Sequence, residues 1–480
     1  MTMSDPETRT KTDIMPRLGE QLDYAVSSFG YSSVYIWITA FMTIFLTDYA
    51  GVPAAAVSLL LLVVRFFDAV NDPLIGSIAD RTHSRFGRFK PWVGIGGTVM
   101  CILIVMMFAT QKSWPLHLKI IWVWVVYILI TVASTCQQMP YNALCGVITS
   151  SAEGRIKLSN TRMVCSSLGT NFTNLIAAAL ILTFSGTHRT VSTARGYLGA
   201  VIFSVAIGLP FMLWTAFRSR ERVLPPPVQR REGGRVPVRT MIKCLTGNKY
   251  ALICVLGQFV AGFHAYGRMT IMTYYFTYYE GDFKLYSMTG MIGMFTGIVG
   301  SGVIAPWIYK MFHHKGKAVG FSFAAAGILV APMYWFSAKG VWFWVFYAVS
   351  TAVGTAASGL RYACDGDNTD YAEYKYGVRV DGFLSSFVSL SLKAGGAVGP
   401  AVMLAVINSL GYAVNVHQNQ AVMNALNISM SFLPAVLLLI IGVTFWFGYD
   451  MDEKKHKEIV RVIEERHREQ ESAIDQKGDR

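Results

Sequence analysis

Long apolar stretches separated by short polar turns recur along almost the whole of this 480-residue sequence. An α-helix needs roughly 20 apolar residues to cross about 30 Å of hydrocarbon. Charged residues make up 15% of the sequence, against about 25% in a typical soluble domain. Twelve stretches of sufficient length can be delimited, at residues 24–48, 54–79, 91–110, 120–148, 163–184, 197–217, 250–279, 286–309, 318–336, 341–364, 383–409 and 422–449. The chain is therefore predicted to be a polytopic membrane protein.

These stretches are predicted to be helices, which makes the fold class all-α with twelve transmembrane helices. A backbone that faces lipid must satisfy its own N–H and C=O groups, so only helices and closed barrels cross a membrane. The strands of a membrane barrel alternate apolar and polar residues, and that alternation is absent here.

The positive charges are distributed unevenly between the two sides of the predicted membrane. The net charge of +13 alone would be compatible with a nucleic-acid partner. If the amino terminus is cytoplasmic, however, 32 of the 42 Lys and Arg residues fall in cytoplasmic segments, six on the opposite side and four within helices. Such an excess in cytoplasmic loops determines orientation. We therefore expect both termini in the cytoplasm, a multi-pass protein of the cell inner membrane, no nucleic-acid partner and, by default, a monomer.

One long polar segment, residues 218–249, separates six predicted helices from the next six. It contains Pro225, Pro226 and Pro227, and Pro-rich linkers are extended and semi-rigid. Two bundles that rock about a midplane site are the arrangement of major facilitator transporters, and by analogy we expect that fold. We expect five parts: an N-terminal segment (1–23), a six-helix bundle (24–217), the central loop (218–249), a second six-helix bundle (250–449) and a tail (450–480). The tail is expected to form a short solvated helix with no role in transport.

The second predicted helix carries a polar stripe made of Arg65, Asp68, Asn71 and Asp72. Residues three, four and seven apart share one helical face. Each ionised residue near the bilayer centre costs about 2.5–3.5 kcal/mol, so this face should line an aqueous cavity or pair internally. Two carboxylates and an amide suit a small hard cation, and a proton could use the same pair. Alternatively, the stripe is a structural ion pair with Arg65, or its charges reach the membrane surface.

The fourth and eleventh predicted helices also carry polar residues. Thr135, Gln138 and Asn142 share a face of the fourth helix, where Pro140 should cause local unwinding that exposes carbonyl groups to an ion or solute. Thr135 is the expected cation ligand, although interhelical hydrogen bonding would explain the same residues. Lys393, in the eleventh helix, precedes Gly395 and Gly396, small residues that let another helix approach. It should pair with the acids of the second helix, or else extend to the surface.

At these residues the chain resembles the glycoside, pentoside and hexuronide cation symporter family of the major facilitator superfamily, which includes the melibiose and glucuronide carriers. The resemblance covers nearly the whole length. It depends on RFFDAVNDPLIG at 65–76, SRFGRFKPW at 84–92, PYNAL at 140–144, Thr161 with Arg162, and DNTDYAEYKYGVR at 367–379 followed by Lys393.

The resemblance implies cation-coupled symport of a sugar by alternating access, with Na⁺ or H⁺ as coupling ion and no cofactor. It further implies a cation site formed by Asp68, Asn71, Asp72 and Thr135. The substrate and coupling residues would be Gln138, Asn142, Arg162 and Lys393, and a cytoplasmic gate would be formed by Asp367, Asp370, Glu373 and Arg379.

Several departures from the melibiose carriers bear on the substrate. Ser32 stands where those carriers have a sugar-binding carboxylate, and Gln138 and Asn142 stand where they have an acid and a Trp. Two intramembrane cations, Arg268 and Arg361, are present in addition to the residues of the family pattern. Because the planar guanidinium matches a carboxylate in a bidentate manner, we hypothesise an anionic sugar such as a uronide. The alternative is that both arginines pair with nearby acids or carbonyls.

Other classes of protein fit less well. A membrane enzyme is not expected, because the sequence contains no phosphate-binding loop, HExxH, GxSxG or Cys–His pattern of metal spacing. A non-transporting solute sensor would need no coupling acid pair. A symporter of a lipid-like solute is a third possibility on the same fold.

Overall fold

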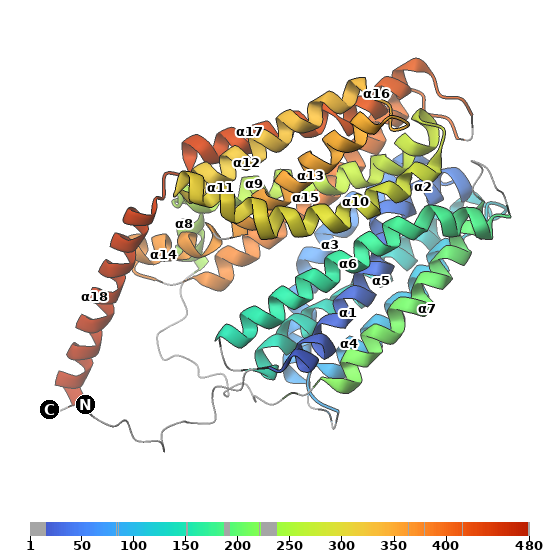
Figure 1. Ribbon diagram of the computed structural model, residues 1–480. Coiled ribbons are helices and arrows are strands. Elements are labelled where there is room, and N and C mark those ends of the chain that lie inside the picture. Colours follow the sequence, from blue (N-terminus) through green and yellow to red (C-terminus); the bar gives the residue numbers. More distant parts are fainter. Residues whose placement is uncertain are drawn as a thin grey trace. The chain divides into compact units, whose positions relative to one another are not determined.

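The computed structural model describes residues 16–82, 84, 86–149, 152–186, 193–219, 221, 238–362, 364–378, 380–414 and 416–478. Within these ranges every regular element is a helix (Figure 1), which confirms the predicted all-α class.

The first half of the chain forms long helices joined by short turns. The first span begins as α1 (Leu18–Ile36) and continues through the π-helical turn η2 (Trp37–Phe41), α2 (Met42–Ile44) and a second π-helical turn, η3 (Phe45–Tyr49). The helices that follow are α3 (Ala54–Arg81), α4 (Lys90–Phe108), α5 (Leu116–Ile148), α6 (Ala152–Phe184) and α7 (Ala194–Arg218).

The second half contains more interruptions. In chain order its elements are α8 (Val238–Thr246), α9 (Lys249–Tyr274), η4 (Tyr275–Tyr279), η5 (Phe283–Leu285), α10 (Tyr286–Val299), η6 (Gly300–Ile304), α11 (Ala305–Phe312), α12 (Lys315–Val330), η7 (Ala331–Trp335), α13 (Val341–Tyr362), α14 (Cys364–Tyr376), α15 (Asp381–Ser409), α16 (Gln420–Met430), α17 (Phe432–Gly448) and α18 (Glu453–Gly478).

Eleven of the described helical segments are long and apolar enough to cross a membrane, and each coincides with a predicted span. The remaining predicted span, 54–79, corresponds to α3, of which Ala54–Val64 forms a shorter apolar stretch. Its 28 residues would extend about 42 Å at 1.5 Å per residue, which is enough to cross a bilayer. Twelve spans are therefore compatible with the structure.

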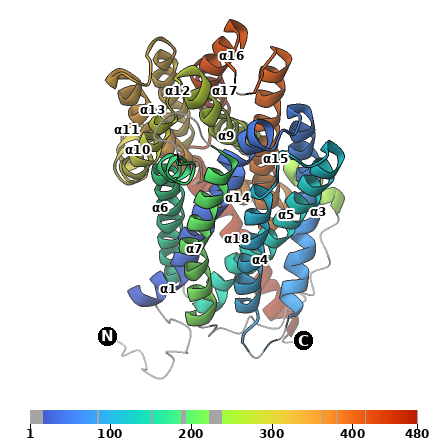
Figure 2. The same ribbon diagram turned by 90° about the vertical axis from the view of Figure 1, so that its right-hand side faces the viewer.

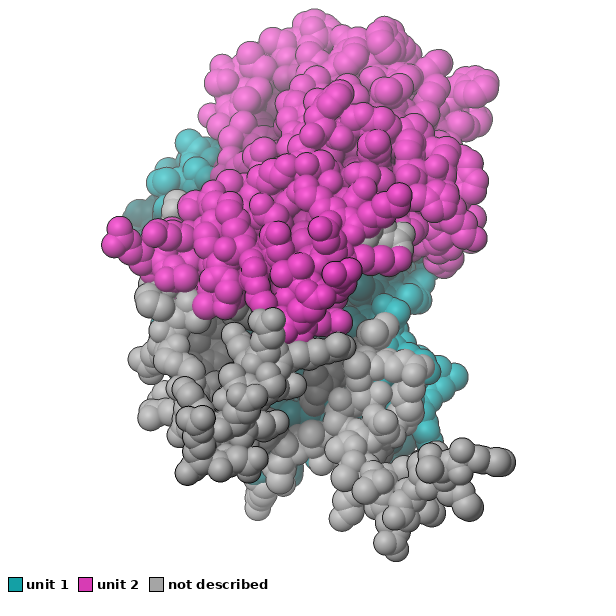
Figure 3. Space-filling model, turned by 90° about the vertical axis from the view of Figure 1, so that its left-hand side faces the viewer, with its two compact units in different colours: residues 1–230, 272–294, 411–418 teal, residues 231–271, 295–410, 419–480 magenta. Residues whose placement is uncertain are grey.

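The chain divides into two compact units (Figure 3). Unit 1 comprises Met1–Arg230, Met272–Met294 and Gly411–Gln418, and unit 2 comprises Arg231–Ile271, Phe295–Leu410 and Asn419–Arg480. Two segments from the second half of the sequence therefore belong to the unit that contains the first six predicted spans.

In unit 1 the helices run alongside one another (Figure 2), with α1 against α6 and α7, α4 against α5 and α7, and α3 against α5. Glycines permit the closest approaches. A Cβ at Gly30 would lie 2.2 Å from the carbonyl oxygen of Gly208, and one at Gly290 would lie 2.3 Å from the backbone nitrogen of Leu175. The first contact joins α1 to α7, and the second joins the segment Met272–Met294 to α6. Small residues at such contacts are typical of membrane helices.

The helix α5 continues through Pro140 without interruption. The local unwinding predicted at this position is therefore wrong. A proline removes only one N–H from the hydrogen-bond ladder, and neighbouring helices and local adjustments can compensate for that loss in a membrane span.

The tail and the central loop contain helices that belong to unit 2. The predicted tail helix exists as α18, but it is not simply solvated, because Ile459 and Ile463 are buried in the unit's hydrophobic core. It packs against α14. The short helix α8, which was not predicted, buries Cys244 and Leu245 in a neighbouring cluster with Ala372 of α14.

Candidate functional site

Two of the four predicted cation ligands have described side chains, and both are buried in unit 1. Asn71 on α3 and Thr135 on α5 each have an exposed fraction of 6%, and the two helices pack together. The Nδ2 atom of Asn71 has no hydrogen-bond partner among the described residues. An unsatisfied buried amide costs free energy, so an additional partner at this position would be stabilising. The side chains of Asp68 and Asp72, like that of Arg65, lie outside the described part of the structure.

Two predicted substrate residues, 20 positions apart, are brought into contact. The Nη1 atom of Arg162 on α6 donates a hydrogen bond to Oδ1 of Asn142 on α5. The guanidinium carbon lies 5.6 Å from the ring centroid of Tyr141, which places the cation over an aromatic face. Arg162 therefore has both a polar and an aromatic contact on α5.

Tyr141, which was not predicted as a site residue, is held firmly by α1. Its hydroxyl donates to the backbone oxygen of Tyr24 at 2.9 Å and accepts from Ser28 at 2.9 Å. The two tyrosine rings stack with their centroids 4.7 Å apart. Because Tyr141 is fixed on three sides, it restricts where the Arg162 guanidinium can lie. The only indication in the sequence that Tyr141 belongs to this site is its place in the PYNAL segment, next to Asn142.

Hydroxyl groups connect α1 to its neighbours further along the helix. Ser32 and Ser166 share a hydrogen bond of 2.7 Å between α1 and α6, and Tyr31 and Ser134 share one of 2.7 Å between α1 and α5. Gln138, on the same side of α5 as Ser134, is partly exposed. The position that holds a carboxylate in melibiose carriers thus contributes a neutral hydroxyl here.

The two additional arginines are buried inside unit 2. Arg268 on α9 has an exposed fraction of 9%; its guanidinium lies 5.1 Å from the ring centroid of Tyr347 and its Nη2 lies 3.5 Å from the Met333 sulfur. Arg361, in the last turn of α13, has an exposed fraction of 1%. Burial strengthens a cation–π contact. The contact of either arginine with a substrate stays a prediction.

Lys393 is partly exposed on α15, within one turn of a close contact with α9. A Cβ at Gly395 would lie 1.9 Å from the carbonyl oxygen of Phe259, and one at Gly262 would lie 2.4 Å from that of Leu392. The expectation that small residues near Lys393 admit another helix is therefore confirmed. Pairing of Lys393 with the acids of the second span stays a prediction.

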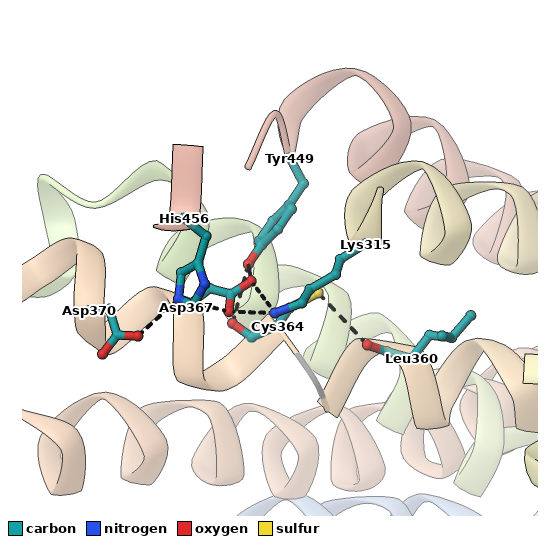
Figure 4. A network of polar contacts seen from close by, with 7 residues as sticks. All are labelled: Lys315, Leu360, Cys364, Asp367, Asp370, Tyr449 and His456. Carbon is teal, nitrogen blue, oxygen red and sulfur yellow. Dashed lines mark hydrogen bonds and ion pairs between the residues drawn. The ribbon is translucent and has the colours of Figure 1, made fainter. Parts of the chain in front are cut away.

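The predicted gate acids lie on α14 and form a polar network inside unit 2 (Figure 4). Lys315, at the start of α12, donates to both carboxylate oxygens of Asp367 at 2.7 and 2.9 Å. His456 of the tail helix lies 3.4 Å from Asp367 and 3.0 Å from Asp370. The Tyr449 hydroxyl donates to Asp367 at 3.4 Å. Burial raises the pKa of Tyr449 well above its usual range, so this hydroxyl keeps its proton.

This network joins three elements that are far apart in the sequence: α12, α14 and α18. Glu373, the third predicted gate acid, is also buried on α14, and Arg379 lies outside the described residues. Lys315 and His456 were not predicted. Lys315 was one of several basic loop residues, and nothing in the tail sequence indicated which face would pack.

A second polar cluster, the Asp48 cluster, lies in unit 1 and consists of Thr47, Asp48, Tyr274, Tyr278 and Tyr412. Asp48, with an exposed fraction of 1%, accepts hydrogen bonds from the hydroxyls of Tyr278 and Tyr412 and from Thr47 at 2.6 Å. Thr47 and Tyr274 share a hydrogen bond of 2.9 Å. The sequence gives no sign of this buried cluster, because Asp48 ends the first apolar stretch, where a charged residue is ordinarily at the membrane surface.

Comparison with known proteins agrees with this architecture. The family model described as "MFS/sugar transport protein" matches residues 23–453. The chain is 27% identical to the isoprimeverose transporter of Lactiplantibacillus pentosus, with 95% of this chain and 94% of that protein covered. It is 25% identical to the glucuronide carrier protein homolog of Escherichia coli (strain K12), with 90% and 93% covered. It is also 25% identical to the putative sulfoquinovose importer of Salmonella typhimurium, with 94% and 93% covered.

Solved structures show the same fold at low sequence identity. A bacterial homologue of the human lysosomal transporter Spinster has a TM-score of 0.63 at 13% identity, with 90% of this chain and 95% of that chain covered. The nucleoside transporter NupG has a TM-score of 0.59 at 14% identity, with 91% and 100% covered.

The family model and the apolar helices define a multi-pass membrane transporter, and the structural neighbours share its fold. Within that class the chain belongs to the MFS/sugar transport protein family, the group of glycoside, pentoside and hexuronide symporters that its motifs resemble.

Proposed function

We propose that the protein is a cation-coupled symporter that takes up a sugar or glycoside by alternating access and prefers an acidic one. The observation that carries this proposal is the position of α5, which contributes to both predicted sites. Thr135 and Asn142 lie seven residues apart on one face of this uninterrupted helix, about 10 Å apart along its axis. Because such a helix is rigid, binding of the cation at Thr135 would affect the position of Asn142 in the sugar site, and sugar binding would likewise affect the cation site.

The cation site would combine the carboxylates of Asp68 and Asp72 with the oxygens of Asn71 and Thr135. Oxygen ligands of this kind suit a small hard cation. The Nδ2 atom of the buried Asn71 amide is a donor without a partner among the described residues, so it would favour a neighbouring carboxylate and leave Oδ1 for the cation. The coupling ion would be Na⁺ or H⁺.

The sugar site would include Arg162, Asn142 and Gln138. A guanidinium offers a planar set of donors that fits a carboxylate or adjacent hydroxyls, and the Tyr141 ring holds it in place. Two of the similar proteins are named for a glucuronide and a sulfoquinovose, which are acidic sugars. Three further cations, Arg268, Arg361 and Lys393, would be additional contacts of an acidic substrate.

Uptake into proteoliposomes would test the proposal. Purified protein is reconstituted, a gradient of Na⁺, Li⁺ or H⁺ is imposed in turn, and uptake of a radiolabelled glucuronide is followed with neutral galactosides and free uronides as competitors. We expect one gradient to drive accumulation and uronides to compete better than galactosides. Asp68→Cys should abolish gradient-driven uptake while the protein remains folded.

The outcomes separate the alternatives. Solute binding without any solute-dependent cation flux would indicate a sensor. Uptake of a lysophospholipid but of no glycoside would indicate a lipid-like solute. Inhibition by neutral sugars with none by uronides would remove the preference for acidic substrates while leaving sugar symport intact.

The orientation belongs to the same proposal. Both termini would lie in the cytoplasm, on the strength of the Lys and Arg asymmetry, and the membrane would be the cell inner membrane. The protein would act as a monomer.

A further inference from the structure

The guanidinium of Arg162 contacts three neutral groups of unit 1. Its Nη1 atom donates to Oδ1 of Asn142, and its carbon lies over the ring of Tyr141. The hydroxyl of Tyr24, on α1, interacts with the same guanidinium. An amide and a phenol carry no charge at neutral pH. The cation is therefore bound by the protein without being neutralised by these partners.

Among the described residues, Arg162 forms no ion pair with a carboxylate. Two acids lie on α1 close to Tyr24 in the sequence, and both are engaged elsewhere. Asp23 accepts from the indole nitrogen of Trp214 on α7 at 2.7 Å. Glu20 accepts from the backbone N–H of Arg17 at 3.2 Å. The full positive charge of Arg162 is thus available to a solute.

The base of this arrangement is buried, and its outer side is open. Tyr24 and Tyr141 each have an exposed fraction of 1%. Asn142 is exposed and Arg162 is partly exposed, although both lie in segments long and apolar enough to cross a membrane. Charged groups within a span ordinarily face an aqueous cavity rather than lipid. A solute in that cavity would reach the guanidinium N–H groups that Asn142 does not occupy.

The two tyrosines fix each other through reciprocal hydrogen bonds. The Tyr141 hydroxyl donates to the backbone oxygen of Tyr24 at 2.9 Å, and the Tyr24 hydroxyl donates to the backbone oxygen of Tyr141 at 3.3 Å. Ser28, one turn further along α1, donates to the Tyr141 hydroxyl at 2.9 Å. These bonds join α1 to α5 where Arg162 of α6 contacts both tyrosines. The position of the guanidinium therefore depends on three helices.

We propose that these neutral contacts determine the charge selectivity of the sugar site, with Tyr24 and Tyr141 as positioning residues for Arg162. The substrate class is a sugar that carries a carboxylate, which pairs with two N–H groups of the guanidinium. A carboxylate among the protein partners would neutralise the cation, and the site would then lose its preference for an acidic sugar. This inference rests on the sugar site of the proposed function but not on cation coupling.

Equilibrium binding to the purified full-length protein in detergent tests the selectivity. The probes are para-nitrophenyl β-glucuronide and para-nitrophenyl β-glucoside, which differ only in the carboxylate or hydroxymethyl group at C6. We expect the glucuronide to bind about tenfold more tightly. Binding of neither probe, or a glucuronide affinity no higher than that of the glucoside, overturns the proposal. Selective binding of the glucuronide without its accumulation under any ion gradient would contradict symport and support this inference.

An isosteric change tests the need for a neutral partner. Asn142→Asp keeps the acceptor for Nη1 of Arg162 and adds a negative charge, so glucuronide affinity should fall about tenfold while glucoside affinity changes little. Asn160→Asp is the matched control. It adds the same charge at an exposed position of α6, on another face because two residues correspond to a rotation of about 200°. Equal losses of glucuronide affinity in the two variants contradict the assignment.

Removal of single hydroxyls tests the positioning residues. Tyr141→Phe and Tyr24→Phe keep both rings but lose the bonds that fix them, and each should lower the ratio of glucuronide to glucoside affinity about threefold. Tyr31→Phe removes a hydroxyl bond to Ser134 between the same two helices and should leave the ratio unchanged. A purely structural role would weaken both probes equally. An unchanged ratio in both variants, or the same fall in Tyr31→Phe, removes the positioning role, and circular dichroism establishes that each variant is folded.

Discussion

The buried carboxylate of Asp48 is satisfied by hydroxyl groups. Its two oxygens accept from Thr47, Tyr278 and Tyr412, and the two tyrosine hydroxyls also contact each other at 3.2 Å. The three donors come from three segments of the chain, and all belong to unit 1. Asp48 therefore holds the segments around residues 278 and 412 to the first span.

Removal of this carboxylate should destabilise unit 1. In Asp48→Ala, buried hydroxyls lose their acceptor, and we expect the free energy of unfolding to fall by about 3 kcal/mol. Tyr278→Phe removes one donor and should cost about 1 kcal/mol. Thermal unfolding of the detergent-solubilised protein measures both. An unchanged unfolding temperature in Asp48→Ala would show that the hydrogen bonds have no net effect on stability.

Arg162 is the described residue on which the proposed sugar site depends most. Arg162→Ala should reduce the specificity constant for uptake about 100-fold, and Arg162→Lys, which keeps the charge but not the planar donors, about tenfold. Initial rates in proteoliposomes at several solute concentrations provide the comparison. Lys157→Gln, an exposed cation on the same helix, is the control and should transport normally. Normal uptake by Arg162→Ala would remove the residue from the site.

At the level of elements, the start of α4 is capped by a residue from beyond α7. The Glu221 carboxylate accepts from the backbone N–H groups of Arg88, Phe89 and Lys90 at 2.7, 2.9 and 3.1 Å. Negative charge at a helix N-terminus is favourable because these N–H groups have no partner within the helix. Gly87 has a φ of +112°, and a Cβ there would lie 2.7 Å from the same carboxylate. The turn thus requires glycine for two reasons.

Loss of this cap should destabilise the turn between α3 and α4. We expect Glu221→Ala to lower the free energy of unfolding by about 1–2 kcal/mol, and Glu221→Gln, which retains an acceptor, by less. Chemical denaturation in detergent gives the values. As a control, Glu465→Ala breaks an exposed ion pair with Arg461 and should change stability little. Equal values for Glu221→Ala and Glu465→Ala would contradict the capping role.

The tail helix α18 should keep α14 ordered. Its anchors are the buried Ile459 and the contacts of His456 with Asp367 and Asp370. His456→Ala combined with Ile459→Ala should increase hydrogen exchange of backbone amides in 364–376 and lower stability by about 3 kcal/mol. Exposed Arg461→Ala on the same helix is the control. Unchanged exchange in the double variant would mean that α14 is stable without the tail.

Elements and contacts differ in how far they could be predicted from the sequence. The positions of the spans could be predicted because each apolar stretch must bury itself in lipid independently of the others. The shared face of Thr135 and Asn142 followed from helical spacing alone. The cluster at Asp48 could not be predicted, because its partner Tyr412 is 364 residues away and no periodicity relates the two. The same holds for His456, whose role depends on which face of α18 packs.

For the whole molecule, the topology depends on whether α3 crosses the membrane. With α3 as a span the chain crosses the membrane twelve times and its termini share one side, whereas eleven crossings would separate them. We expect green fluorescent protein to fluoresce, and alkaline phosphatase to be inactive, when either is fused to the carboxyl terminus of the bacterially expressed protein. The reverse pattern, with a cytoplasmic amino terminus established by the same fusions, would mean that α3 does not cross.

Asp48 belongs to η3, the second of two π-helical turns in the first span. A π turn holds one residue more than an α turn, and one residue corresponds to a rotation of about 100° around an α-helix. A return of η3 to α geometry would therefore swing the carboxylate out of reach of Tyr278 and Tyr412 without any loss of helical backbone. The contacts of the first span with the segments around residues 278 and 412 therefore depend on the π geometry of η3.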